Sequence, residues 1–505
     1  MPGKGDCLDA VAHGEERLEA YSGLFHTDAD AYRPRDEAEL RCIFAFATRE
    51  SRAVTVRGGA HAFDDQSLGC QIVVSMENFN KIEIGPGAQV TVGAGAPWGK
   101  IVRRLKRKGL VPYGTVTSSL ATPGGTLAAD CLSRFSPSYG KEAEHVLSFR
   151  MMRIDGSAQD YSPPPPGNPN PATWTEDQRI FMAVVGGFGY LGALLEITYA
   201  VRRCGSSRIA VRTEVDKLDS FEHLVSKLIP ETKTARANAT ARANSDCGGE
   251  DWEAISAGLY PAGGDHPSAL LFKSKLVKTC WRWPYLLHHP HFPLTILAQW
   301  LMRKRRLCRV LSRGFFMFTW SGMKYTDGLQ GYLFFMDANL IARNLARTFG
   351  IDLHTIQQTF VVPIDLDAPD AHQPLLDWLD RAQKELAARN LTPTITDVLY
   401  LPQDWTFCLS PNARRPGFAV SYAFETNDTD PVEDAFRALA DILWTDFHGH
   451  VSLVKNVRVN PATLHAMYGP QAGEFLTLKH RLDPSDLLRN KFFSRVLDPP
   501  PPPAP

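Results

Sequence analysis

The stretch Val54-Thr-Val-Arg-Gly-Gly-Ala-His-Ala-Phe-Asp-Asp-Gln-Ser67 decides how this chain is interpreted. A β-branched run, Val54 to Val56, leads into the glycine pair Gly58–Gly59. Glycine has no Cβ and tolerates positive φ, so the backbone of such a turn comes close to a bulky ligand. Consecutive N–H groups in a turn of this kind form a concave site for an anion. The stretch therefore predicts a binding loop, with the imidazole of His61 at its tip beside the ligand.

The composition sets the class of protein. The chain has 505 residues, of which 44% are hydrophobic and 22% are charged, which is typical of a globular protein with two or three structural units. Lys+Arg and Asp+Glu both number 55, so no net charge attracts nucleic acid. The nine cysteines contain no C-x-x-C pair, so neither a zinc site nor a disulfide framework is expected. The first residues lack the apolar region of a secretory signal peptide, and no run of about 18 apolar residues could form a transmembrane helix. We therefore expect a cytoplasmic protein.

Strands and helices alternate along the first 203 residues. Apolar spacing predicts helices over 36–49 and 96–108, and short β-branched runs predict strands over 53–56, 71–75, 81–84 and 89–92. Two further glycine clusters, 121–130 and 185–192, each lie beside a predicted helix or strand. After residue 203, predicted strands (209–214, 269–275, 358–364) and helices (220–228, 370–388) are typical of an open sheet covered on one face. The pattern indicates an α+β protein.

Four motifs occur in the order found in one flavoprotein superfamily. These motifs are the opening stretch, Thr122-Pro-Gly-Gly125, Ala183-Val-Val-Gly-Gly-Phe-Gly-Tyr-Leu-Gly192 and Leu482-Asp-Pro-Ser-Asp-Leu-Leu-Arg-Asn490. Through them the chain resembles the vanillyl-alcohol-oxidase superfamily, also called the p-cresol methylhydroxylase type. The resemblance implies a two-subdomain FAD-binding domain and an antiparallel-sheet substrate domain. We expect an FAD-binding domain over 1–203, a substrate or cap domain over 204–445, a C-terminal return segment over 446–498 and a disordered tail over 499–505.

The same resemblance implies the residues that bind FAD. They are Arg57, Gly58, Gly59, Ala60, His61, Ala62, Phe63, Gln66, Ser67, Gly114, Thr122, Gly124, Gly125, Ala129, Leu132, Leu194 and Asn490. Asp64 and Asp65 are expected to cap the loop by side-chain–backbone hydrogen bonds.

Two branches of the superfamily share further motifs with the chain. His61-Ala-Phe63 resembles the H-S-F motif of polyol and aldonolactone oxidases, which implies covalent attachment of the flavin to His61; the alternative is an unlinked loop histidine. Residues 357–363 and 451–456 resemble decaprenylphosphoryl-ribose oxidases, which implies that Lys455 and Gln357 lie at the substrate, with His448 as a further catalytic candidate. Two departures stand out: the histidine that follows A-x-x-D in that branch is replaced around Cys131–Leu132, and Ser452 takes the place of its flavin-contacting tyrosine.

Two segments outside these motifs suggest other contacts. His288-His-Pro-His291 has a poor spacing for a metal, so a loop is the better interpretation and no metal site is expected. Residues 294–320 combine apolar and basic residues, which fits either a peripheral membrane contact or a cap helix with a solvated basic end. The oligomeric state does not follow from the sequence.

The functional hypothesis is an FAD-dependent oxidase or dehydrogenase acting on a CH–OH group of a small sugar, polyol or lactone-like substrate. Its alternatives are a flavin-dependent biosynthetic tailoring enzyme or C=C reductase acting on a lipid-like substrate, and a non-enzymatic interaction protein.

Overall fold

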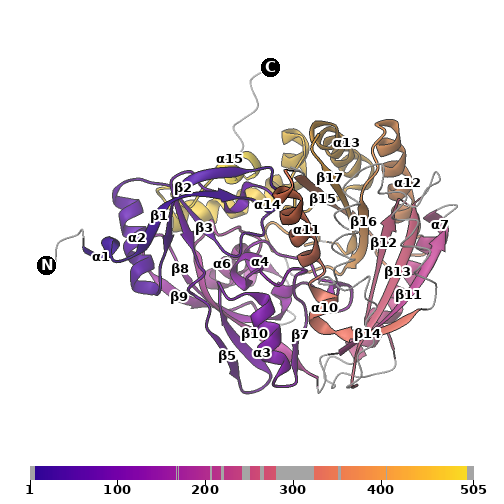
Figure 1. Cartoon of the computed structure of the whole chain (residues 1–505), viewed down its shortest axis with the longest axis horizontal. Coiled ribbons are helices and arrows are strands. Elements are labelled where there is room, and N and C mark those ends of the chain that lie inside the picture. The colour runs from indigo at the N-terminus through magenta and orange to yellow at the C-terminus, as the bar shows by residue number, and fades with distance from the viewer. Residues whose placement is uncertain are drawn as a thin grey trace.

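The protein is described by a computed structural model (Figure 1). It describes residues 6–165, 168, 170–204, 208–217, 221–241, 251–261, 267–279, 323–350, 354–404, 407–413 and 415–497. Within them the fold is α+β, with three sheets and helices on their faces. The predicted segments 288–291 and 294–320 lie outside the described residues.

The first sheet has the strand order β1-β2-β4-β3 and carries the opening stretch at its edge. Its strands are β1 (Ala12–Glu19), β2 (His26–Arg33), β3 (Val54–Arg57) and β4 (Ile72–Ser75). Helix α2 (Glu37–Arg49) packs on this sheet through Leu40, Ile43, Phe44 and Ala47, which are fully buried, as the apolar spacing predicted. Strand β3 ends at Arg57, so the glycine pair begins where the strand stops.

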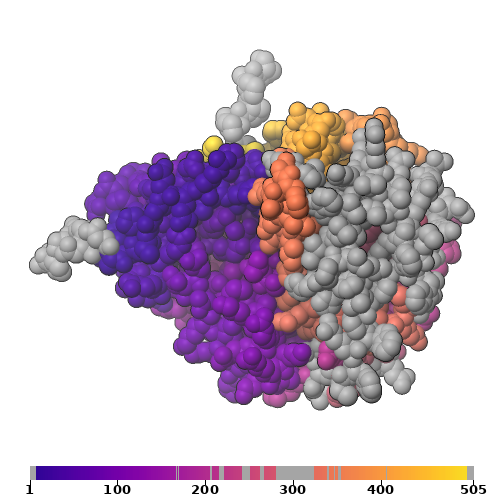
Figure 2. Space-filling model, viewed as in Figure 1, coloured from indigo at the N-terminus to yellow at the C-terminus, as the bar shows by residue number. Residues whose placement is uncertain are grey.

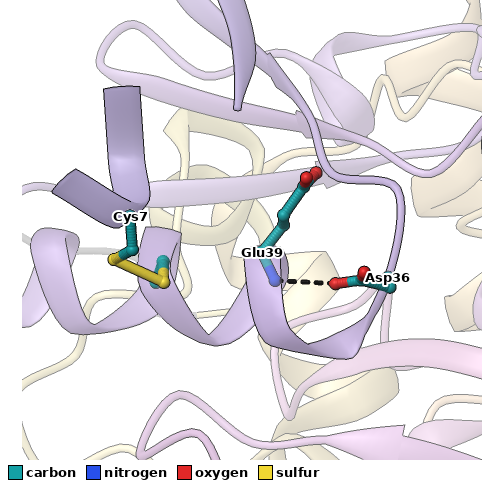
Figure 3. The surroundings of a disulfide bond; sticks show 4 residues. Cys7, Asp36 and Glu39 are labelled. Atoms are coloured by element: carbon teal, nitrogen blue, oxygen red, sulfur yellow. Dashed lines mark hydrogen bonds between the residues drawn. A yellow bond between two sulfur atoms is a disulfide. The ribbon is translucent and has the colours of Figure 1, made fainter. Parts of the chain in front are cut away.

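An unpredicted disulfide joins the first helix to α2. Cys7 in α1 (Asp6–Asp9) bonds to Cys42 in α2, and the two Cα atoms are 6.2 Å apart (Figure 3). The same view shows Asp36 capping α2, where its carboxylate accepts a hydrogen bond from the Glu39 N–H at 2.9 Å. No disulfide framework was predicted, and the separation of 35 residues between Cys7 and Cys42 is not a spacing from which a bridge can be inferred.

The second sheet is antiparallel and has the order β5-β6-β10-β8-β9, with β7 paired to the end of β10. Its strands are β5 (Ile82–Gly85), β6 (Gln89–Gly93), β7 (Leu110–Pro112), β8 (Val146–Met152), β9 (Ala158–Tyr161) and β10 (Ala193–Arg203). The accompanying helices are α3 (Trp98–Lys106), α4 (Pro123–Ala128), α5 (Ser136–Tyr139), α6 (Glu176–Val184) and the short 3₁₀ turns η1 (Asp65–Ser67), η2 (Glu142–His145) and η3 (Pro171–Thr173). Helix α4 begins at Pro123, within the glycine cluster 121–130.

The third sheet has eight strands in the order β14-β11-β13-β12-β16-β17-β15-β18, and all its pairs are antiparallel. The strands are β11 (Arg208–Lys217), β12 (Ala254–Tyr260), β13 (Ser268–Val277), β14 (Lys324–Gly328), β15 (His354–Pro363), β16 (Ile395–Leu401), β17 (Gly417–Thr426) and β18 (His450–Val451). Helices α7 (Phe221–Ala241), α12 (Gln373–Ala388) and α13 (Asp430–Phe447) pack on this sheet and on one another. In Figure 1, α7 and α12 lie at the right, away from the N-terminal half.

The remaining helices connect the two halves. Helices α10 (Leu329–Leu333) and α11 (Met336–Thr348) lie between the N-terminal half and the large sheet (Figure 1). In Figure 2, α11 is exposed at the surface along the edge of the N-terminal half. Helices α14 (Pro461–Leu482) and α15 (Lys491–Val496) follow the large sheet in sequence, and the segment between them pairs with β3 through the bridge Val54–Leu488. No helix of the described part is long and apolar enough to span a membrane.

Candidate functional site

A single cavity of about 600 Å³ lies where the glycine clusters face the large sheet. The first cluster contributes residues 58–63 with Gln66 and Ser67; the second contributes Ala121, Thr122, Gly124, Gly125 and Ala129; the third contributes Phe188, Gly189, Gly192 and Leu194. The large sheet and the segment after β18 contribute Ser256, Gly258, Tyr260, Gln357, Thr359, Asp397, Ser421, Ser452 and Lys455. Segments far apart in the sequence therefore share one cavity, as the ordered motifs predicted.

The opening stretch presents unused hydrogen-bond donors to this cavity. Among the described residues, none of the backbone N–H groups from Gly58 to Phe63 donates a hydrogen bond. Nearby, the hydroxyl of Thr122 is buried without a partner, although it lines the cavity. A buried hydroxyl such as that of Thr122 is costly unless it finds a hydrogen-bond partner, and the N–H groups of the partly exposed loop are available to the same ligand. The loop and Thr122 therefore fit an anionic group, such as a pyrophosphate.

The two glycines are needed for close packing rather than for positive φ. A Cβ on Gly58 would collide with the Thr122 hydroxyl, and a Cβ on Gly59 would collide with the carbonyl of Leu120. Neither glycine has positive φ; the left-handed residue of the loop is Ala60, at φ 60°. Of the two properties that glycine offers at this turn, the structure uses the absence of a Cβ, and the left-handed conformation falls one residue later.

Three predicted binding residues do not line the cavity, and two of them support its loop. Arg57 donates from Nη1 to the Ser67 hydroxyl at 3.1 Å and from Nη2 to the Glu19 carbonyl at 2.8 Å. Asn490 donates from Nδ2 to the carbonyls of Asp65 and Gln66, at 3.2 and 3.0 Å. Both side chains thus hold the loop from behind. Gly114 lies near Ser133 and also falls outside the lining.

Asp64 anchors the loop to the C-terminal segment. Its carboxylate is fully buried and accepts hydrogen bonds from Arg458 Nη1 at 3.0 and 3.1 Å, Asn456 Nδ2 at 2.8 Å and the Val457 N–H at 2.9 Å. Asp65 pairs with Arg495 at 2.9 Å. The expected role of the two aspartates was structural, and it is; their partners, however, lie some four hundred residues away along the chain.

His61 is engaged through both ring nitrogens. Nδ1 lies 2.6 Å from the carbonyl oxygen of Gly59, which only accepts, so Nδ1 carries the proton. Nε2 lies 2.8 Å from the Ser118 hydroxyl, and that hydroxyl lies 3.0 Å from the carboxylate of Asp337 in α11. Burial lowers the pKa of His61. In the neutral ring, Nε2 holds the lone pair.

Lys455 and Gln357 reach the cavity, and His448 does not. The Lys455 ammonium lies 3.9 Å from the centroid of the Phe63 ring, and burial lowers its pKa to about 8. Gln357 lines the cavity from β15. His448 ends α13 in a left-handed conformation, φ 52°, and packs edge-on against Trp444. That turn directs the chain into β18, which leaves the imidazole outside the lining.

The two departures from the decaprenylphosphoryl-ribose oxidase branch both lie at the cavity. Cys131, Leu132 and Ser452 all line it. The Ser452 N–H donates to the Thr359 carbonyl at 2.9 Å, which ties the segment after β18 to β15.

Sequence reasoning missed several lining residues from the large sheet. Asp397, Thr359, Ser421 and Tyr260 line the cavity, and each stands in a strand that is otherwise rich in apolar residues. A carboxylate within such a strand is unusual, since aspartate is depleted in strands. That signal was present in Ile395-Thr-Asp-Val-Leu-Tyr-Leu401. No group of three or more metal-ligating side chains occurs in the described residues.

Comparison with known proteins identifies the glycine-rich half. A family model described as an FAD binding domain matches residues 31–162. The chain contains an FAD-binding domain of the p-cresol methylhydroxylase type. The matched range holds the opening stretch and the Thr122–Gly125 turn, so the loop with free N–H groups belongs to the part that binds FAD. FAD is therefore the cofactor for which these residues form a site.

The curated relatives match over limited segments. The chain is 24% identical to cytokinin dehydrogenase 3 of Oryza sativa subsp. japonica over 208 residues, which is 39% of this chain and 37% of the relative. It is 28% identical to decaprenylphosphoryl-beta-D-ribose oxidase of Mycolicibacterium smegmatis over 166 residues, covering 32% and 34%. It is 33% identical to D-2-hydroxyglutarate dehydrogenase of Escherichia coli over 144 residues, covering 26% and 14%. The matches thus span less than half of these relatives.

Proposed function

We propose that the protein is an FAD-dependent oxidoreductase that oxidises a CH–OH group of a sugar, polyol or lactone-like compound. The observation that carries the proposal is the single cavity shared by the FAD-binding loops and the polar residues of the large sheet. Two relatives support the substrate class, because their names specify a ribose compound and a hydroxy acid. Bound FAD supplies a two-electron acceptor for the hydride of such a carbon.

The residues of the sheet side have roles that follow from their chemistry. The Lys455 ammonium is a hydrogen-bond donor and a positive charge, so it polarises a substrate oxygen. The side-chain amide of Gln357 makes no hydrogen bond with the described residues and orients a hydroxyl group through its donor and acceptor. Aromatic side chains, including Tyr260 and Phe335, line the remaining walls and exclude water.

Anaerobic mixing of the purified protein with polyols, aldoses and aldonolactones tests the proposal. The expected result is bleaching of the visible flavin band by at least one compound of these classes, without bleaching by a simple alkanol. Bleaching by none of them would refute oxidation of this substrate class. Flavin reoxidation by an alkene in place of dioxygen would favour a C=C reductase, and a colourless purified protein would favour an interaction role.

We further propose that His61 forms a covalent bond to the flavin, in which Nε2 bonds to the carbon of a flavin ring methyl group, that carbon gives up one C–H bond, and two electrons and two protons pass to dioxygen. Because Nδ1 keeps its proton on the Gly59 carbonyl, Nε2 is the nitrogen that has a lone pair for this bond. After acid precipitation, the yellow colour should remain with the wild-type protein and be lost from His61→Ala. Flavin that is released freely from the wild-type protein would contradict covalent attachment and leave the proposed oxidation unaffected.

A further inference from the structure

A row of polar positions crosses four strands of the large sheet. Gly258 in β12 pairs with Asp397 in β16, Asp397 pairs with Ser421 in β17, and Ser421 pairs with Thr359 in β15. Directly paired residues of antiparallel strands place their side chains on the same face. All four line the cavity, so Asp397, Ser421 and Thr359 form a continuous polar strip of the cavity wall beside Gly258.

Within this row, only Asp397 has a side chain without a protein partner among the described residues. The hydroxyls of Thr359 and Ser421 bond to each other, and Gly258 has no side chain. Neither carboxylate oxygen of Asp397 accepts a hydrogen bond or forms an ion pair with the described residues. A partly buried carboxylate without donors is unfavourable. Its position in the cavity wall therefore indicates that a ligand supplies the donors.

The charges around Asp397 restrict the kind of ligand. The described lining contains two cations, Arg134 and Lys455, and three carboxylates, Asp327, Asp397 and Glu425. Asp327 accepts from the Gly328 N–H at 2.6 Å and Glu425 from the Thr355 hydroxyl at 3.0 Å, so both are engaged. Arg134 donates to the Tyr332 carbonyl and lies 4.0 Å from the Phe335 centroid. The lining thus carries charges of both signs, and most of them are already engaged, which suits a neutral hydrogen-bond donor.

Tyr260 adds a flat apolar surface beside the row. A Cβ on Gly258 would lie 3.0 Å from the Tyr260 ring, so the absent side chain leaves room for this ring over the strand. An aromatic ring next to a carboxylate and two hydroxyls matches a compound that presents C–H bonds on one face and hydroxyls at its edge. Burial raises the pKa of Asp397, which agrees with a carboxylate that has lost water and gained no protein donor.

We propose that Asp397 selects polyhydroxylated, uncharged substrates by accepting hydrogen bonds from their hydroxyl groups, with Tyr260 beside it against their C–H face. The inference rests on the proposed function, since it assigns the residue that recognises the substrate at the same site. A carboxylate that accepts from two neighbouring hydroxyls distinguishes a polyol from a mono-alcohol of equal size. Asp397 is thus a specificity-determining residue.

Binding measurements without turnover test this role. Sorbitol, xylitol and cyclohexanol are titrated anaerobically into the FAD-loaded wild type and Asp397→Asn after the flavin has been reduced with dithionite, so that no hydride transfer can follow, and isothermal titration calorimetry gives each affinity. Asp377→Asn, an exposed carboxylate on α12, is the matched control. The wild type and the control should prefer the polyols to cyclohexanol. Asp397→Asn should weaken polyol binding by about 10- to 100-fold, the effect of one lost charge-assisted hydrogen bond, and leave cyclohexanol unchanged.

The affinities of the wild type and of Asp397→Asn can overturn the proposed role of Asp397. Equal polyol affinity in Asp397→Asn and wild type, or no preference for polyols in the wild type, would overturn it. If Asp397→Asn loses FAD or fails to fold, Asp397→Ser, which keeps a small polar group, replaces it with the same expectation. Oxidation is judged separately with oxidised flavin: polyol binding, with bleaching by none of the polyols, aldoses and aldonolactones, would refute the proposed function, while the loss of binding in Asp397→Asn would still support the role of Asp397.

Discussion

At the scale of single residues, Lys455 makes the site dependent on pH. Burial lowers its pKa to about 8, so the side chain is a cation below that pH and neutral above it. The rate of flavin reduction by substrate should therefore fall as the pH rises through about 8. Stopped-flow reduction across this range measures the effect.

Two variants give the control for this prediction. Lys455→Arg should move the fall to higher pH, because the guanidinium stays protonated beyond pH 12 or so. Lys455→Met should be slow at all pH values. An unchanged pH profile in Lys455→Met would show that another group is responsible.

Asp64 ties the binding loop to the C-terminal segment through four buried hydrogen bonds. Asp64→Ala leaves Arg458, which is 6% exposed, without one of its two carboxylate partners and leaves the Val457 N–H without an acceptor. Removing one partner of a buried ion pair costs about 3–5 kcal/mol. Asp64→Ala should thus lower the free energy of unfolding by about this amount and reduce bound FAD, measured by denaturant titration and the flavin-to-protein ratio. Asp65→Asn, which removes one half-exposed pairing with Arg495, should be far milder.

At the scale of elements, the turn after β3 restricts Gly59 by close packing and Ala60 by its backbone conformation. Gly59→Ala places a Cβ against the Leu120 carbonyl, so the turn moves and its free N–H groups lose their alignment. The purified Gly59→Ala protein should contain little FAD. Ala60→Gly is the matched control, because glycine is favoured at φ 60° and should keep full flavin content with equal or greater stability. Similar flavin content in both variants would refute this explanation of the glycine pair.

The helices, strands and loops also differ in how well they could be predicted from the sequence. Helix α2 was predicted closely because Leu40, Ile43, Phe44 and Ala47 follow a local spacing that any buried helix face requires. The FAD-binding loops were predicted because their motifs are short and contiguous. Asp397 was missed because its position in the cavity wall depends on strand pairing with Gly258 and Ser421, which are distant in sequence. His448 was misplaced because a left-handed helix end, invisible in a pattern of residue types, turns it away from the cavity.

At the scale of the whole molecule, a buried charge cluster joins the FAD-binding half to the large sheet. Lys141 is 1% exposed and forms ion pairs with Asp130, which follows α4, and Asp404, which follows β16. It also donates to the Ser410 hydroxyl at 2.8 Å, and that hydroxyl donates to Asp404 at 2.5 Å. The ammonium is thus the counter-charge for carboxylates from both sides of the cavity.

Lys141→Met tests whether this cluster holds the two halves together. It leaves two buried carboxylates near each other without a counter-charge, which costs about 3–5 kcal/mol. Denaturant unfolding should show that loss. Asp130→Asn and Asp404→Asn, added together to Lys141→Met, should recover part of it, because a neutral cluster needs no counter-charge. The sheet and the FAD-binding loops share the cavity, so Lys141→Met should also weaken FAD retention. Wild-type stability of Lys141→Met, or no recovery in the triple variant, would show that apolar packing between the halves holds the cavity in shape without these charges.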